Sequence, residues 1–225
     1  MKLYAFPPSP NTWKVRAVAA HLGVPLELEM VDLTKGGSHS PDYLAINPTG
    51  RTPALVDGDL KLWESNAIMQ YIASQKPNSL WPNDARTQAD IARWQSWQLA
   101  HFSKEGCEPL LFQRLVKQLL NMGAPDEAVV AKGLECFNKE AQVLDVHLAK
   151  QPYLVGKELT LADFSVAAPL FYADRAGMPL APYAKLRDWF ARVSALPCWR
   201  ETAPHPVAAA AVSYTHLTLP TNREV

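Results

Sequence analysis

Three groups of residues in the first third of the chain have types and spacings that suit the binding of a small anionic peptide. Thr52-Pro53 begins an apolar strand pattern, Glu64-Ser65 opens a helical pattern, and Ser9 lies between the first predicted strand and helix. Backbone groups at a strand edge can pair with a peptide, and a helix N-terminus attracts a carboxylate. A hydroxyl beside helix N–H groups can donate to a thiolate and so lower the pKa of the thiol.

Each of these groups also has a simpler structural interpretation. The two pairs fit an ordinary edge strand, in which proline lacks a ladder donor, and a plain helix start. Ser9 suits an N-cap, and so do Asn11 and Thr12. The chemistry therefore depends on whether the fold brings the three groups together.

The first 76 residues alternate strand and helix patterns in the order βαβ, then α, then ββα. Gly23 suits the left-handed residue after a helix, and Asp57-Gly58 is a hairpin signal. The expected elements are a strand over 3–6, a helix over 15–22, a half-buried strand over 26–30, a short helix or turn over 41–46, strands over 52–56 and 60–62, and a helix over 64–74.

The rest of the chain has helical periodicity. Residues 77–86 have the Pro- and Asn-rich composition of a linker. In Thr160-Leu161-Ala162-Asp163 the first and last residues form a capping box, which begins a helix that continues to about Ala176. The other expected helices begin near Ile91 and cover about 126–149 and 183–195.

These patterns predict an α/β domain followed by an all-α domain. The expected boundaries are 1–76 for the first domain, 77–86 for the linker and 87–205 for the helical domain. The final stretch, 206–225, differs in its residue pattern from the rest of the chain. Its last part, 211–225, resembles translated vector sequence. We treat this tail as non-native and leave it out of the fold prediction.

Charge and composition exclude several classes of function. The 22 basic and 22 acidic side chains cancel, so the chain has no net field to attract nucleic acid or an anionic membrane. No apolar run approaches the roughly 20 residues that span a bilayer, and the N-terminus does not fit a signal peptide. The three cysteines lack zinc-binding spacing. We therefore expect a cytoplasmic protein with no metal and no nucleic acid or membrane partner.

Taken together, three motifs resemble the glutathione transferase family over nearly the whole chain. They are NPTGRTPALVDG, ESNAIMQYIA and LTLADF, in that order. The resemblance implies a thioredoxin-like N-terminal domain followed by an all-helical domain. The segment SPNTWKV is similar to serine-type, phi-like and zeta-like members, which implies that Ser9 is the catalytic residue. Asn11, Thr12 and, at lower rank, Tyr4 stay open as alternatives.

The resemblance also implies two sets of binding residues and glutathione as the co-substrate. The implied glutathione contacts are Thr52, Pro53 with a cis peptide bond, Glu64 and Ser65, with His39 and Arg51 as candidates for the glycyl carboxylate. The implied second-substrate site, between the domains, is lined by Phe6, Pro7, Trp13, His101 and Leu110.

The function implied is conjugation of the glutathione thiolate to small, mostly apolar electrophiles by a homodimeric enzyme. A glutathione-dependent disulfide reductase and a non-catalytic glutathione-binding protein stay open as alternatives. A zeta-like isomerase is a further alternative, although Ser9-Pro10-Asn11 stands where zeta-type isomerases have Ser-Ser-Cys.

Overall fold

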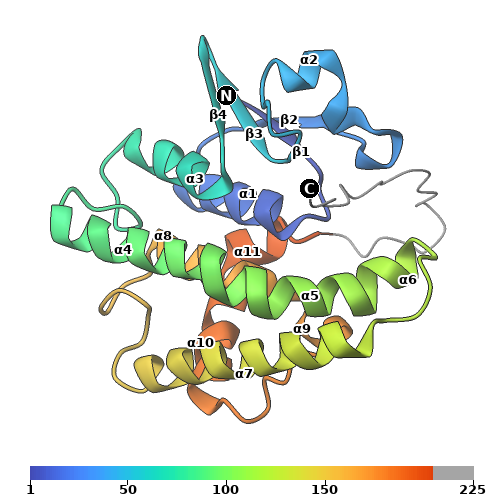
Figure 1. Cartoon of the computed structure of the whole chain (residues 1–225). Coiled ribbons are helices and arrows are strands. Elements are labelled where there is room, and N and C mark those ends of the chain that lie inside the picture. The colour runs from blue at the N-terminus through green and yellow to red at the C-terminus, as the bar shows by residue number, and fades with distance from the viewer. Residues whose placement is uncertain (205–225) are drawn as a thin grey trace, which may run out of the picture.

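The computed structural model of this 225-residue chain describes residues 1–204 and places a small α/β unit on a larger group of helices (Figure 1). The predicted tail at 206–225 lies outside the described residues. A thioredoxin-like domain followed by helices is the predicted fold class, and it is confirmed.

The N-terminal unit is built on one four-stranded sheet. Its strands are β1 (Lys2–Ala5), β2 (Glu27–Met30), β3 (Ala54–Asp57) and β4 (Leu60–Trp63), in the order β2-β1-β3-β4. β1 is parallel to β2 and antiparallel to β3, and β3 pairs antiparallel with β4. In the hairpin Asp57 pairs with Leu60, so its two turn residues are Gly58 and Asp59, one position later than predicted.

The strands and helices of this unit follow the predicted order βαβ, α, ββα. The helices of this unit are α1 (Pro10–Leu22), α2 (Pro41–Leu44) and α3 (Ser65–Ser74), with 3-10 turns at Leu33–Lys35 and Gly37–His39. Gly23 ends α1 at φ 63° and donates its N–H to carbonyls of the last turn, as its type predicts.

The expected half-buried strand at 26–30 is only partly confirmed. β2 forms, but Leu28 and Met30 are 47% and 69% exposed. β2 is an edge strand, and all four of its residues are exposed to solvent in this chain. The alternation of apolar and acidic residues therefore predicted the strand correctly and its burial wrongly.

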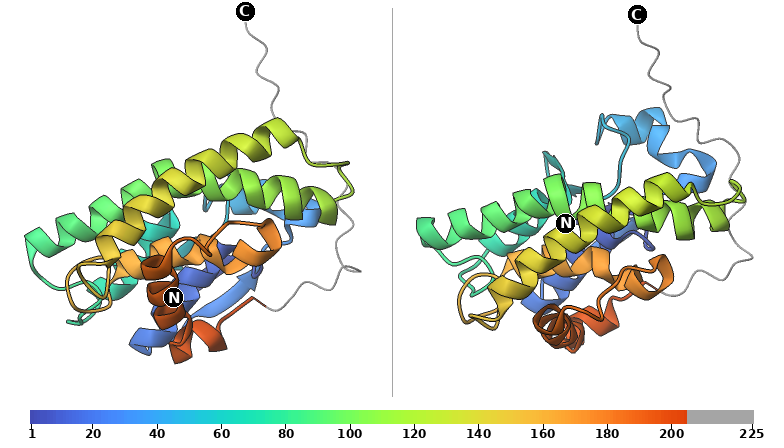
Figure 2. Two further views of the ribbon diagram at one scale, coloured as in Figure 1. Left: turned by 90° about the horizontal axis from the view of Figure 1, so that it is seen from below. Right: turned by 60° about the horizontal axis from the view of Figure 1, so that its bottom comes forward.

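The helical part contains two long helical rods that lie side by side and run in opposite chain directions (Figures 1 and 2). The first runs without interruption as α4 (Ala85–Trp97), a π-helical segment (Gln98–Cys107), α5 (Glu108–Leu111), a second π-helical segment (Phe112–Val116) and α6 (Lys117–Leu119). The second rod is α7 (Glu127–Leu148). The remaining helices are α8 (Leu161–Ala167), a 3-10 segment (Ala168–Tyr172), α9 (Ala173–Ala176), α10 (Ala184–Ser194) and α11 (Pro197–Glu201).

Two glycines allow the rods to cross closely. A Cβ added to Gly106 would lie 3.0 Å from the Cα of Phe137, and one added to Gly133 would lie 3.2 Å from a methyl carbon of Leu110. Real Cβ atoms rarely approach other atoms this closely, because interiors are close-packed. Glycine at both positions therefore suits the observed separation of the two helices.

The predicted capping box at the start of α8 is confirmed. Asp163 is fully buried, and its carboxylate accepts four hydrogen bonds. The donors are the backbone N–H groups of Leu154 (3.0 Å) and Thr160 (2.9 Å), the hydroxyl of Thr160 (3.1 Å) and Nε1 of Trp189 (2.8 Å). Burial raises the pKa of Asp163, and these donors oppose the rise. One side chain thus connects α8, the loop before it and α10.

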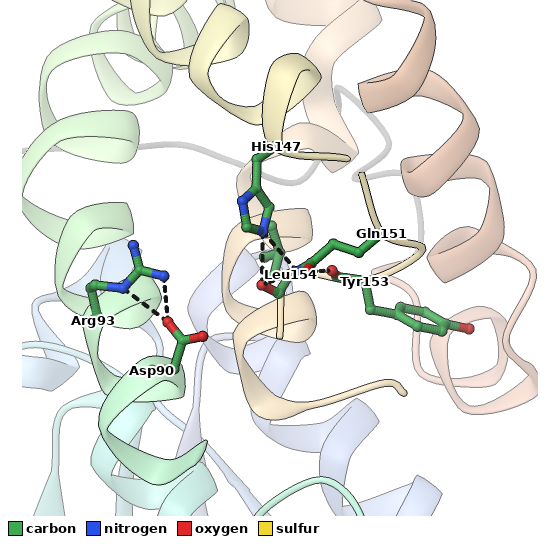
Figure 3. Close-up of polar contacts among 6 residues, drawn as sticks. All are labelled: Asp90, Arg93, His147, Gln151, Tyr153 and Leu154. Atoms are coloured by element: carbon green, nitrogen blue, oxygen red, sulfur yellow. Dashed lines mark hydrogen bonds and ion pairs between the residues drawn. The ribbon is translucent and has the colours of Figure 1, made fainter. Parts of the chain in front are cut away.

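A second polar cluster holds the other end of that loop (Figure 3). Nε2 of His147, at the end of α7, lies 2.9 Å from the carbonyl oxygen of Leu154, and the amide of Gln151 donates to the same oxygen at 2.9 Å. The Gln151 amide also donates to Tyr153 O at 2.8 Å. The loop is therefore fixed at both ends, so Asp163 keeps its partners.

One apolar core extends through both parts of the molecule, from Leu3 in β1 to Trp199 in α11. The domains are therefore packed firmly on each other, which fixes the groups between them. Within residues 1–204, no helix combines the length and hydropathy required to cross a bilayer.

Candidate functional site

Ser9 occupies the N-cap of α1 with an extended backbone, but its hydroxyl makes no capping bond. The backbone instead fixes the turn: the Ser9 N–H donates to Phe6 O and its carbonyl accepts from Trp13 N–H, each at 2.9 Å. The hydroxyl of Tyr172, from the helical part, donates to Pro8 O at 2.8 Å. The turn is therefore held from both sides while the Ser9 hydroxyl stays available to a ligand.

The N-terminus of α3 lies beside that of α1. The hydroxyl of Ser65, the first residue of α3, donates to Oδ1 of Asn11 at 3.4 Å. The preceding residue, Glu64, is exposed and has φ 71°, which is uncommon for a residue with a Cβ and is found mostly at functional sites. Two helix N-termini, each attractive to anions, thus converge.

Thr52, two residues before β3, has a free backbone. The Thr52–Pro53 peptide bond is cis, as the resemblance implied. Within the described part of the chain, the Thr52 backbone forms no hydrogen bond. The carbonyl of Arg51 accepts from the hydroxyl of Tyr43 at 2.5 Å and the amide of Asn47 at 2.6 Å. These two bonds fix the segment, so a peptide could pair with Thr52 as an added strand.

His39 and Arg51, the two candidates for a glycyl carboxylate, lie close together. Gly50 has φ 65°, and a Cβ added there would be 3.1 Å from Nε2 of His39. The His39 ring therefore lies against the residue that precedes Arg51. Ser38 Oγ lies 3.1 Å from Nδ1 of the same ring, which fixes its orientation.

Three of the predicted site residues are fully buried. Trp13 is fully buried, and its indole donates to Trp199 O at 3.2 Å with ring centroids 4.0 Å apart. Leu110 is fully buried against Gly133. Both belong to the apolar core, which disfavours their predicted role at a second-substrate site. Thr12 is fully buried as well, so a substrate cannot reach the hydroxyl that was an alternative to Ser9.

The other residues predicted for the second-substrate site, and Asn11, are exposed at least in part. Phe6 and Pro7 are half-buried on the turn before Ser9, and His101 is exposed on the first π-helical segment. Asn11 is half-buried, with its side-chain oxygen directed to Ser65. No group of three or more His, Cys, Asp or Glu that could hold a metal occurs in the described portion of the chain.

Sequence reasoning missed a buried polar network directly beneath the converging helix ends. Lys14 is fully buried, and its Nζ donates to Oδ1 of Asn66 at 2.7 Å. The same oxygen accepts from Ser165 Oγ at 3.0 Å, and the Asn66 amide donates to Gln95 O at 3.4 Å. Gln95 Nε2 donates to Ser165 Oγ at 3.1 Å. The network joins α1 and α3 to α4 and α8.

The sequence held a signal for this network. Lys14 lies four residues before Val18 and therefore falls on the same face of the helix as the buried stripe. Burial lowers the pKa of Lys14 to about 7, and the negative charges of Glu64 and Glu108 oppose that shift. Burial likewise raises the pKa of Glu108, which Arg51 counters.

Comparison with known proteins identifies the family. The model for the N-terminal domain of glutathione S-transferase matches residues 1–74, and the model for its C-terminal domain matches residues 87–197. The chain belongs to the glutathione S-transferase family. The predicted fold class, the predicted enzyme and glutathione as its co-substrate are therefore confirmed.

Similar members of the family come from plants and bacteria. The chain is 41% identical to glutathione S-transferase 3 of Zea mays over 208 residues, which cover 90% of this chain and 92% of that protein. It is 30% identical to GstB of Escherichia coli over 207 residues, or 89% and 96% of the two chains. The structure of glutathione S-transferase I bound with lactoylglutathione superposes with a TM-score of 0.81 at 29% identity, covering 90% of this chain and 97% of that one.

Proposed function

We propose that Ser9 activates glutathione in this enzyme by donating its hydroxyl hydrogen to the thiolate, which then attacks small, mostly apolar electrophiles. The observation that supports this role is the Ser9 hydroxyl at the N-terminus of α1, which makes no capping bond. The first turn of α1 also contains no acidic side chain, so nothing there opposes the attraction of the helix for an anion.

The remaining contacts follow the shape of the peptide. The free backbone of Thr52 would pair with the cysteinyl part of glutathione. Glu64 and the N–H and hydroxyl of Ser65 would hold the ammonium and carboxylate of the γ-glutamyl end. His39 and Arg51 would meet the glycyl carboxylate, because both are basic and lie beside Gly50.

Activation of the thiol supplies only part of the rate. A thiol with pKa about 8.5 is roughly 3% ionised at pH 7, and a pKa near 6.5 makes it mostly thiolate. Nucleophilicity falls with basicity, with a Brønsted slope of about 0.4–0.5, which returns roughly 8-fold of a roughly 25-fold gain. Holding both reactants between the domains must therefore supply most of the acceleration.

A pH titration of bound glutathione tests this proposal. The thiolate absorbance of the complex should titrate well below pH 8, about two units below the free thiol. The Ser9→Ala variant should bind glutathione and titrate closer to the free value. Binding by the wild-type protein without any shift would contradict thiol activation and favour a site that only binds glutathione.

We also propose that two copies of the chain form a homodimer, on the ground of family membership. Sedimentation equilibrium should give twice the mass of one chain. A monomer at micromolar concentration would contradict the dimer and leave the roles of Ser9 and Thr52 unaffected.

A further inference from the structure

Lys14 is the one fully buried lysine among residues 1–204, and its surroundings do not satisfy it. An ammonium has three donors, yet the Nζ of Lys14 has a single acceptor, the neutral amide oxygen of Asn66. None of the ion pairs in the described structure includes Lys14. A buried charge normally requires a partner of opposite sign, so this position favours the neutral amine in the free protein.

Lys14 lies close enough to the proposed glutathione site for charges there to affect its protonation. Its partner Asn66 directly follows Ser65, the residue proposed to hold the γ-glutamyl carboxylate. Of the charged groups that act on Lys14, Glu64 lies at the start of α3 and Glu108 lies on α5. The contacts from α4 and α8 are neutral, namely Gln95 and Ser165 through Asn66.

We propose that Lys14 couples glutathione binding to proton uptake. Lys14 is neutral in the free protein and takes up a proton when an anionic glutathione ligand binds at the proposed glutathione site. This inference rests on the proposed function. The ligand carboxylate at the N-terminus of α3 adds to the negative charges of Glu64 and Glu108, which favour the protonated form of Lys14, and the proton comes from solvent. Lys14 stays bonded to Asn66 in both states and acts on the ligand by its charge alone.

The burial of Lys14 supports a response near neutral pH. With a pKa of about 7, roughly three quarters of the protein has a neutral Lys14 at pH 7.5, and about a tenth at pH 6. Proton uptake should therefore be large at pH 7.5 and small at pH 6. A histidine with an ordinary pKa near 6.5 would show the same trend, so only the comparison with variants of Lys14 assigns the uptake to this residue.

Calorimetry in buffers of different ionisation enthalpy measures this uptake. The ligand is S-methylglutathione, whose blocked sulfur removes the thiol proton from the balance. Wild-type protein at pH 7.5 should take up about 0.7 proton more than Lys14→Met, and uptake by the wild type should fall at pH 6. Lys14→Arg, which keeps a permanent charge, should bind the ligand without the extra uptake. Lys157→Met, an exposed control, should behave as the wild type.

The possible outcomes separate the two proposals. Equal proton uptake by the wild type, Lys14→Met and Lys14→Arg, with binding intact, overturns the role of Lys14 and leaves the glutathione site standing. Failure of the wild type to bind S-methylglutathione overturns the site, and the role of Lys14 with it. If Lys14→Met does not fold, the comparison of the wild type with Lys14→Arg at pH 7.5 still decides the result.

Discussion

Asp163 and Lys14 are both fully buried and ionisable, and both lie in the first two turns of a helix, yet their surroundings differ sharply. Asp163 in α8 accepts four hydrogen bonds, whereas Lys14 in α1 has one partner. The caps differ in the same way, because the Thr160 hydroxyl is bonded to Asp163 and the Ser9 hydroxyl makes no capping bond. A fully satisfied helix start stabilises the fold, and an unsatisfied one leaves donors for a ligand.

The largest effect on stability should come from removing the Asp163 carboxylate. Asp163→Ala leaves the N–H groups of Leu154, Thr160 and Trp189 buried without an acceptor, so we expect a loss of about 3–5 kcal/mol in the free energy of unfolding. Urea denaturation measures it. Asp163→Asn keeps the shape and some of the acceptor capacity and should lose less. A loss below about 1 kcal/mol in the alanine variant would contradict the structural role of this carboxylate.

Ser9→Ala should show the opposite pattern to Asp163→Ala, with a large loss of turnover and little loss of stability. Loss of one donor to a developing or bound anion costs on the order of 100-fold in turnover, so kcat with a model electrophile should fall by about that factor while glutathione still binds. Because the hydroxyl makes no capping bond, the stability should change by less than about 0.5 kcal/mol. Normal turnover would remove Ser9 from the mechanism.

The pH dependence of stability should reveal the lowered pKa of Lys14. Its pKa is about 7 in the folded state and 10.5 in the unfolded chain, so above pH 7 the unfolded state binds more protons. Stability should therefore rise by about 2 kcal/mol between pH 7 and 9 relative to Lys14→Met. Parallel stability curves of the two proteins over that range would show that Lys14 keeps an ordinary pKa in the folded chain.

The smallest expected effect is the difference in stability between the two N-cap variants, Thr160→Ala and Ser9→Ala. Thr160→Ala removes one hydroxyl bond to Asp163, and N-cap replacements of this kind cost about 1 kcal/mol. Ser9→Ala, measured by the same thermal or urea unfolding, should cost less than half of that. Equal losses would mean that the Ser9 hydroxyl contributes to the fold, and the contrast between the two helix starts would disappear.

Local sequence signals predicted much of this molecule. Gly23, the hairpin near Gly58 and the Thr160–Asp163 capping box depend on neighbours along the chain, so residue type and spacing were sufficient. The same holds for the position of Ser9 before α1. The cis bond at Pro53 was implied by family resemblance alone.

The errors arose where contacts are distant in sequence. The family resemblance assigned Trp13 and Leu110 to a ligand site, but they pack against Trp199 and Gly133. The exposure of Met30 depends on what covers the sheet edge. Lys14 was overlooked because its main partner, Asn66, lies 52 residues away.

The hydrogen bond from Tyr172 to Pro8 gives the helical half a direct influence on the turn that carries Ser9. The two halves are therefore not interchangeable modules. A chimera that joins this N-terminal half to the helical half of a relative with phenylalanine at the position of Tyr172 would lose the only side-chain bond to Pro8 O in the described structure. The Ser9 turn would then be held from one side, so a chimera built on this N-terminal half must keep that hydroxyl or replace its support for the turn.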